Sequence, residues 1–457
     1  MHLKSTYVGS LLKVTVTCSC GHEVIEWESQ PKIGRAPVGN LIGAAAILLS
    51  GNTFKNVAQV TNLMGVQFFS ETVFYDIQRN LLLPAVNNYY INESQSDIEN
   101  FQGQSLWLSG DGRCDSPGYN AKYCSYSMME MSSQQIITFD LVQVSQASSS
   151  VGMEKVGFVN CMGKMADAGL SVGVMATDRH VGIWEVLEDY KEVDHEFDIW
   201  HLTKSIGKKL TSKARLKGNE ELGPWVNSIK NHLWWSAQNC GGNYLLVEMW
   251  TSIVHHVSNV HEWNSSDLFH KCAHVPLPEN VERSKKWLTP GSKPHQALSE
   301  IVFDKRLLKD LKHVTKACHT GNLEVFHNVL LKYCPKRLHF SYPVMQARLQ
   351  LAVLDHNHNV GREQAVVQRS SVRSAPEGTK RWRYAYSKAA KEWLSKPVME
   401  RKDYGYLKEL MVDVLRIKEG TFQPQVSALP DIPPNIAPIP RPPVTELQDK
   451  AKSRFVK

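Results

Sequence analysis

The sequence predicts an α/β protein, in which helices pack on a mixed sheet and a large helical segment is inserted into the chain. Residues 105–146 contain three strand-like segments in succession, separated by polar turns. Residues 153–200 then alternate helix, strand, helix and strand, the order expected when helices cover a sheet. A long tryptophan-rich helical stretch follows, so we expect an insertion that interrupts the sheet domain.

Length and composition are those of an ordinary soluble protein. The 457 residues are enough for two or three domains, and the net charge of +7 permits a nucleic-acid partner without demonstrating one. No apolar run reaches the roughly 18 residues that a membrane span needs, and the amino terminus has no signal-peptide pattern. The nine cysteines lack the rhythm of a disulfide framework, so we expect reduced intracellular thiols.

Residues 1–35 form the first predicted unit. Leu11–Val16 is expected to be a strand, and Cys18, Cys20 and His22 follow it at close spacing. Structural zinc sites usually have four ligands in paired spacings, so only half of a Zn²⁺ site is visible. A zinc site here would imply that the chain is a fragment whose other ligand pair lies upstream. We favour the alternative, which is a pair of free buried thiols.

Residues 36–100 are predicted to form a small helical domain. Apolar residues recur at helical spacing in Val38–Leu49 and in Thr53–Met64, and Ser70 can cap a third helix. Two helices joined by a short turn that contains glycine match a helix-turn-helix. Because the third helix carries few basic residues, we interpret this unit as a packing or dimerisation element rather than a DNA reader.

Residues 101–202 hold the first part of the predicted sheet core. Leu106–Leu108 is a short buried strand that is expected to end at Gly110-Asp111-Gly112. Glycines on both sides of Asp111 let a phosphate or an ion approach the backbone closely. An ordinary turn explains the same three residues equally well, so the function of Asp111 depends on the rest of the chain.

Four further strands complete the predicted sheet. Two of them alternate in polarity, as in an antiparallel meander, and one is nearly all apolar, as a strand covered on both faces should be. The apolar strand ends at Asp178, and the last strand contains Asp198 and is followed by His201. The four strands are Lys122–Met131, Gln135–Gln146, Leu170–Ala176 and Glu196–Trp200.

Residues 203–320 are predicted to form the helical insertion. Its first helix, Thr203–Lys217, is basic and amphipathic, and Lys204, Lys208 and Lys209 are most simply part of a solvated face. Six of the twelve tryptophans fall between residues 225 and 287, enough aromatic surface for a separate core. No pair among five candidate metal ligands has the tight spacing of known zinc fingers, so we interpret them as core or surface residues. They are Cys240, His256, His261, Cys272 and His274.

Residues 321–420 return to the sheet domain. The first helix of this segment carries Glu324 beside its apolar side, and further helices are expected at Val344–Leu354 and Tyr406–Lys418. Residues 421–457 begin where prolines crowd together, with eight of the twenty-one between positions 424 and 443. We therefore predict a disordered tail.

Three acids, Asp111, Asp178 and Glu324, attract attention together. The strands that end in the two aspartates can be neighbours in a mixed sheet, which would put both side chains at one edge. Clustered carboxylates repel one another unless a cation lies between them. Mg²⁺ and Mn²⁺ prefer oxygen ligands, and two such ions about 4 Å apart act on both the attacking and the leaving oxygen of a phosphodiester. Three unrelated surface acids remain the alternative on spacing alone.

The ordered set of motifs resembles a known family. The motifs GDGRCDSPG, TDRH, FDIWH and TGNLEVFHNVLLKYCPKR, within a resemblance that covers roughly Gly9 to Tyr406, are similar to those of the eukaryotic DDE transposases of the Kolobok type. The resemblance implies an RNase H-like core with a helical insertion between the second and third acids. It further implies that Asp111, Asp178 and Glu324 together bind two Mg²⁺ or Mn²⁺ ions.

The resemblance also assigns roles around these acids. Asp198 and His201 match a D-x-x-H signature that several cut-and-paste families carry between the second acid and the glutamate. We expect His201 to contact the scissile phosphate or to order the site, and a purely structural role is the alternative. Asp115 competes with Asp111 as first acid, and we prefer Asp111 because glycines flank it and because it is predicted at a strand end.

The implied activity is metal-dependent cleavage and joining of DNA. The DNA backbone would be contacted by Lys204, Lys208 and Lys209. The protein would act as a homo-oligomer. It would reside in the nucleus, and Lys380-Arg381-Trp382-Arg383 is a weak nuclear import signal. Many members carry an amino-terminal zinc-dependent THAP domain that reads DNA, and this sequence shows none. The alternatives are a domesticated derivative that binds DNA or protein without cutting, and an RNase H-like host nuclease.

Overall fold

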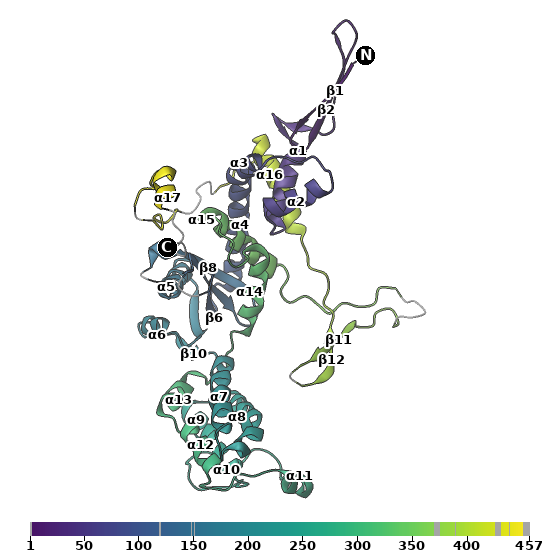
Figure 1. The fold of residues 1–457 in the computed structure, drawn as a ribbon. Coiled ribbons are helices and arrows are strands. Elements are labelled where there is room, and N and C mark those ends of the chain that lie inside the picture. Colours follow the sequence, from purple (N-terminus) through teal and green to yellow (C-terminus); the bar gives the residue numbers. More distant parts are fainter. Residues whose placement is uncertain are drawn as a thin grey trace.

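A five-stranded mixed sheet lies in the middle of the molecule, between a helical layer with an amino-terminal β-sheet and a second helical body (Figure 1). The mixed α/β fold class predicted from the sequence is therefore confirmed. This computed structural model describes residues 2–117, 120–147, 149, 151–369, 375–388, 390–425, 431–437 and 439–450.

The sheet has β6 (Ser105–Cys114) as its central strand. β6 pairs antiparallel with β7 (Tyr123–Glu130), which pairs antiparallel with β8 (Ile136–Gln143). On its other edge β6 is parallel to β9 (Ser171–Thr177), and β9 is parallel to β10 (Asp194–Phe197). The spatial order is thus β10-β9-β6-β7-β8, with three strands in succession and two crossovers.

Two strand boundaries differ from the sequence prediction. β6 does not stop at the glycines, because Asp111 still pairs with Ser127 of β7 and the strand continues to Cys114. β10 ends at Phe197, because the carboxylate of Asp198 caps α7 (Ile199–Ala214) and ends the extended backbone. The predicted strand Glu196–Trp200 was therefore too long, and His201 lies on a helix.

Helices cover both faces of the sheet, and successive side chains of β7 point alternately to one face and to the other. Tyr126 and Met128 point to one face, where α5 (Gly152–Asp167) packs and Phe158 meets Tyr126 edge to face at 5.7 Å between ring centroids. The opposite face packs against α4 (Leu83–Phe101), α14 (Gly321–Tyr333) and α15 (Tyr342–Asn357). Between β9 and β10 the chain forms α6 (Val181–Leu187).

The amino-terminal helical domain contains α1 (Val38–Leu49), α2 (Phe54–Leu63) and α3 (Glu71–Ile77). Ser70 caps α3 as predicted, accepting a bond from the Val73 N–H at 3.4 Å. The third helix does not end at Ile77, because a π-helical turn over Gln78–Leu82 leads from it directly into α4. The sequence analysis missed this long continuation.

The amino terminus forms a three-stranded antiparallel sheet of β1 (His2–Val8), β2 (Leu11–Thr17) and β3 (Glu23–Glu28) (Figure 1). In the turn between β2 and β3, Cys18 and Cys20 form a disulfide, so the prediction of free buried thiols was wrong for this pair. The turn backbone, closed by the Cys18 N–H on the His22 carbonyl at 2.9 Å, holds the two sulfurs together. A Zn²⁺ site with His22 would require the reduced form, because zinc binds thiolates.

The helical body between α7 and residue 313 has its own core around the fully buried Trp250. The chain leaves and returns at adjacent points: the Ile199 N–H donates to the Cys318 carbonyl at 3.1 Å, and the Thr320 N–H donates to Asp198 Oδ2 at 3.0 Å. Besides α7 its helices are α8 (Val226–Asn239), α9 (Asn243–Thr251), α10 (Ile253–His256), α11 (Glu279–Ser284), α12 (Lys293–Val302) and α13 (Lys305–Asp310).

The carboxy-terminal part departs from the prediction at two places. β11 (Trp382–Ser387) and β12 (Glu392–Pro397) form a hairpin that projects from the helices and was not predicted (Figure 1). After α16 (Gly405–Glu419), the tail predicted to be disordered contains α17 (Val444–Lys450), and its residues 426–430, 438 and 451–457 lie outside the described residues. In the described ranges, no helix has the length and apolar character needed to cross a membrane.

Asp355 on α15 is a fully buried charge that ties three segments together. Its carboxylate accepts bonds from the Lys332 ammonium at 2.9 Å, the Lys402 ammonium at 2.6 Å and the Tyr333 hydroxyl at 3.0 Å. Burial alone would raise its pKa, but the bonds from Lys402 and Lys332 outweigh burial and hold the pKa below its usual value. The network fixes α15 against α14 and against the chain that precedes α16.

Candidate active site

Asp111 and Asp178 occupy matched positions on adjacent parallel strands. The last pair between β6 and β9 joins Gly110 to Thr177, so Asp111 is the next residue of β6 and Asp178 is the first residue after β9. Residues in register on neighbouring strands project to the same side of the sheet. The structure thus brings together two acids that are far apart in the sequence.

Glu324 approaches the same place from the first turn of α14. This helix packs on β6, where the buried Arg113 guanidinium donates to the Cys334 carbonyl at the helix end, at 3.0 Å. One turn after Glu324, the Nδ1 atom of His327 lies 3.6 Å from Asp111 Oδ2. The packing of this helix therefore brings the exposed Glu324 close enough for its charge to raise the pKa of both aspartates.

Uncompensated negative charge gathers around Asp111. Burial, together with the charges of Asp178, Glu154 and Glu324, raises the pKa of Asp111 to about 8. Burial also raises the pKa of Asp178, with Glu324 among the contributing charges and His201 opposing them. The carboxyl groups are therefore close enough to affect one another's ionisation in a site that is only partly buried, with the Asp111 and Asp178 side chains 26% and 41% exposed.

Glu154, on α5, is a fourth acid of this cluster that sequence reasoning missed. A Cβ atom added to Gly112 would lie 2.7 Å from Glu154 Cγ, and one added to Gly110 would overlap the Tyr126 hydroxyl. The two glycines thus make room for protein side chains, rather than for a phosphate or an ion at the backbone as the sequence suggested. The glycines implied a close approach, but nothing in the sequence marks Glu154 as the approaching group.

Asp198 holds both the start of α7 and the ring of His201. It accepts bonds from the Trp200 N–H at 2.6 Å and the His201 N–H at 3.1 Å, and His201 Nδ1 lies 3.0 Å from Asp198 Oδ2. The same Nδ1 lies 3.0 Å from Asp178 Oδ1. Burial would raise the pKa of Asp198, but bonds from Thr320 and His201 outweigh it and lower the pKa. In the D-x-x-H motif, Asp198 therefore both caps α7 and orients the ring of His201.

His327 is the other residue that the sequence analysis missed. Burial, together with the positive charges of Arg113 and Lys336, lowers its pKa to about 4, so the ring is neutral at physiological pH. The spacing Glu324-x-x-His327 puts both side chains on one face of α14, and this i, i+3 pattern was the available signal.

The donor groups here suit a hard divalent cation. Asp178, Asp198 and His201 have ligand atoms within 4.8 Å of one another, whereas Asp111 and Glu324 belong to no such group in the described part of the chain. Among the described residues, three buried polar atoms near the acids lack a hydrogen-bond partner, in addition to Asp178 Oδ1 of the acids themselves. Carboxylate oxygens are the ligands that Mg²⁺ and Mn²⁺ prefer. The three unpartnered atoms are the Tyr126 hydroxyl, His180 Nδ1 and His327 Nε2.

Asp115, the competing first acid, is engaged in a turn. Its carboxylate accepts bonds from the Lys122 N–H at 3.0 Å and the Ser116 hydroxyl at 3.2 Å. Its backbone carbonyl accepts from the Arg337 N–H at 3.0 Å. These contacts account for Asp115 as a structural residue.

The three predicted DNA-contacting lysines are exposed on α7. Lys204 is the one nearest the acids: its charge lowers the pKa of Asp178, after the larger effects of burial and His201, and its Nζ lies 4.1 Å from the ring centroid of Trp200. Lys209 lies near Asp304 instead. Lys204 is therefore the best placed of the three to meet a substrate bound at the acids.

A Thr320→Val variant is expected to lower the free energy of unfolding by about 1.5–3 kcal/mol, because the hydroxyl donates to the buried Asp198 carboxylate. Urea unfolding followed by circular dichroism measures this loss. Thr421→Val, at an exposed position, is the control and is expected to change stability by less than about 0.5 kcal/mol. Equal stabilities of the two variants would contradict the clamping role of Asp198.

No protein-family model matches the sequence, and no curated protein matches it. Among solved structures, the Drosophila P element transposase strand transfer complex has a TM-score of 0.28 and 9% sequence identity, covering 69% of this chain and 91% of that chain. So distant a match carries no argument here. The function must be argued from the site itself.

Proposed function

We propose that this chain is a DDE-type transposase of the Kolobok kind, or a derivative of one, that cleaves and joins DNA strands with divalent metal ions. The observation that carries the proposal is the matched placement of Asp111 and Asp178 on adjacent parallel strands beneath the helix of Glu324. In this proposal the five-stranded sheet is an RNase H-like core, and α7 to α13 are the helical insertion between the second and third acids.

Asp111, Asp178 and Glu324 would hold the metal ions. Two bound Mg²⁺ or Mn²⁺ ions would supply activation of the attacking oxygen and charge stabilisation of the leaving oxygen. The raised pKa values of both aspartates support this assignment, because a cation stabilises carboxylates that repel one another in a partly buried site.

The surrounding residues orient the site. Asp198 fixes the His201 ring by its bond to Nδ1, which leaves the second ring nitrogen of His201 for a phosphate oxygen of the substrate. Arg113 fixes the end of α14 and so the height of Glu324 above the strands. We assign Glu154 to the same site as an added negative charge that favours cation binding.

Lysines on α7 would bind the DNA backbone without reading its sequence. Replacing Lys204, Lys208 and Lys209 with glutamine should weaken binding and lower the slope of log affinity against log salt by about 0.9 per lost phosphate contact. Fluorescence anisotropy with labelled duplex DNA over a KCl series measures the slope. Lys213→Gln, on the same helix but paired with Glu300 at 2.7 Å, is the matched control and should leave the slope unchanged.

The test of the proposal is nicking of supercoiled plasmid DNA by the purified chain, with Mn²⁺ and with EDTA. Metal-dependent nicking, with joining of a supplied 3′-hydroxyl end, is expected. Binding without cutting would instead favour a domesticated DNA-binding derivative, and cutting confined to RNA–DNA hybrids would favour a host nuclease. Homo-oligomeric assembly and nuclear residence belong to the same proposal, and sedimentation and a fluorescent fusion test them.

A further inference from the structure

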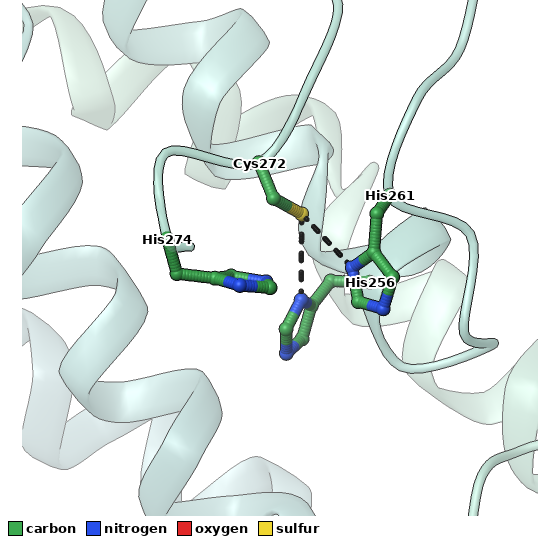
Figure 2. Close-up of side chains that lie close together, drawn as sticks. All are labelled: His256, His261, Cys272 and His274. Atoms are coloured by element: carbon green, nitrogen blue, oxygen red, sulfur yellow. Dashed lines mark hydrogen bonds between the residues drawn. The ribbon is translucent and has the colours of Figure 1, made fainter. Parts of the chain in front are cut away.

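Four side chains of the helical body converge at a place that the proposed chemistry does not use. They come from the end of α10 and from the long irregular stretch between α10 and α11. Figure 2 shows the Cys272 sulfur and the rings of His256, His261 and His274 turned toward one another. One ligand atom from each residue lies within 4.8 Å of those of the other three.

The backbone explains how residues so irregularly spaced come together. Residues 261–272 form a small hairpin closed by an antiparallel bridge between Glu262 and Lys271, and the Cys272 N–H donates to the His261 carbonyl at 2.9 Å. His261 and Cys272 are therefore opposite each other at the open end of the hairpin. His256 is the last residue of α10, and His274 follows Cys272 by two positions. The site could not be recognised from the sequence spacing, because strand pairing within the hairpin, rather than a helix or a zinc knuckle, brings the ligands together.

The distances are those of a metal-binding cluster. The Cys272 sulfur lies 3.4 Å from Nδ1 of His256 and 3.4 Å from Nδ1 of His261. With ordinary Zn–S and Zn–N bond lengths, a tetrahedral site separates sulfur from nitrogen by about 3.6 Å. The three rings are steeply inclined, at 69° to 85°, with centroids 5.0 to 5.2 Å apart, so none stacks on another.

Two of the histidines are oriented by contacts on their other ring nitrogen. His261 Nε2 lies 3.0 Å from Asn259 Oδ1, and Asn259 donates to Glu282 Oε1 at 2.8 Å. His274 Nδ1 lies 2.7 Å from the Val275 carbonyl, which leaves Nε2 of His274 for the centre. Such contacts fix the tautomer of metal-bound histidines and aim the free nitrogen at the ion.

The protonation states agree with the geometry. Burial, with the neighbouring histidines, lowers the pKa of His256 to about 4, so this ring is neutral and has a lone pair to offer. Burial raises the pKa of the Cys272 thiol to about 11, and a bound cation would reverse this by binding the thiolate.

We propose that His256, His261, Cys272 and His274 bind one structural Zn²⁺ ion. One thiolate with three imidazoles is a nitrogen and sulfur donor set that suits zinc, whereas Mg²⁺ and Mn²⁺ prefer oxygen. Four protein ligands complete a tetrahedral shell and leave no position for a substrate. The ion fixes the stretch between α10 and α11 to the end of α10, beside Trp287, whose ring centroid lies 5.8 Å from that of His261. The proposal does not depend on the DNA-cutting function.

The test measures metal bound to the full chain, purified without a polyhistidine tag or chelator. Elemental analysis is expected to find zinc that Cys272→Ser reduces by about tenfold or more at limiting free zinc. His270→Gln is the matched control, because His270 is exposed on the same hairpin and outside the cluster. A Cys18→Ser/Cys20→Ser double variant keeps this zinc, and it separates the site from the amino-terminal turn.

A second measurement needs no variant and so does not depend on folding of Cys272→Ser. Replacement of zinc by Co²⁺ should give the visible bands of a tetrahedral ion and a near-ultraviolet thiolate-to-cobalt band, and X-ray absorption at the zinc edge should fit three nitrogens and one sulfur. A parent chain without zinc, a cobalt spectrum without the thiolate band, or equal zinc in Cys272→Ser and His270→Gln would each overturn the proposal.

Discussion

An Asp178→Asn variant is expected to lose Mn²⁺-dependent DNA nicking by about 100-fold or more, the scale on which removal of one group that stabilises developing charge acts. The amide keeps the size of the carboxyl but removes the charge that would hold a cation next to Asp111. Because the pKa of Asp178 is raised in the parent, the neutral amide should not destabilise the fold. The nicking rate at saturating Mn²⁺, with equal unfolding midpoints, measures the effect.

The matched control for this variant is Asp167→Asn. Asp167 ends α5, and Glu154 of the acidic cluster lies near the beginning of that helix, so the helix rise separates the two by about 20 Å. The control removes one negative charge from the same domain without touching the site. Equal nicking by Asp178→Asn and the parent would refute the assignment of the acids, whereas loss in both variants would point to a global charge effect.

The second large effect is expected for stability. Asp355→Ala should lower the free energy of unfolding by about 3 kcal/mol, because it leaves Lys332 and Lys402 without their shared counter-charge. We expect the lower end of the range for broken buried pairs, because the two lysine side chains are 35% and 30% exposed. Urea unfolding at pH 7 measures the loss, and the exposed Asp76→Ala is the control.

The same carboxylate has a defined pH signature. Its pKa in the folded protein is below the ordinary value of 3.8, so its contribution is fully present above that value and is lost as the pH falls through the folded pKa. The stability difference between parent and Asp355→Ala should therefore be constant near neutrality and shrink below about pH 4. A difference that grows on acidification would contradict this reading of the network.

Much of the sheet could be predicted because its signals are local. Side chains alternate in polarity along β7 and β8, and β9 is almost entirely apolar, because these patterns depend on which faces of each strand the protein covers. The expectation of a mixed sheet also allowed β6 and the strand that precedes Asp178 to be neighbours. The helix cap at Ser70 could be predicted for the same reason. These features depend on a few consecutive residues, so a single sequence is enough to show them.

The errors arose where contacts between segments far apart in the sequence determine the local structure. The glycines around Asp111 suggested a strand end, but pairing with β7 carries β6 through them. Asp198 looked like a strand residue, yet its bonds to Thr320 and to α7 make it a helix cap. Glu154 reaches the acids only through the packing of α5 on the sheet. None of these contacts has a signature within its own segment.

The junction of the helical body with the sheet has an evolutionary consequence. Because Ile199 and Cys318 are joined by a backbone hydrogen bond, everything between them is a closed excursion that begins and ends at one spot. Lengthening, trimming or exchanging that excursion changes no strand register and no distance between β9 and α14. Selection can therefore reshape the part of this appendage beyond α7, the helix that carries His201 and Lys204, while the acids across the junction stay in place.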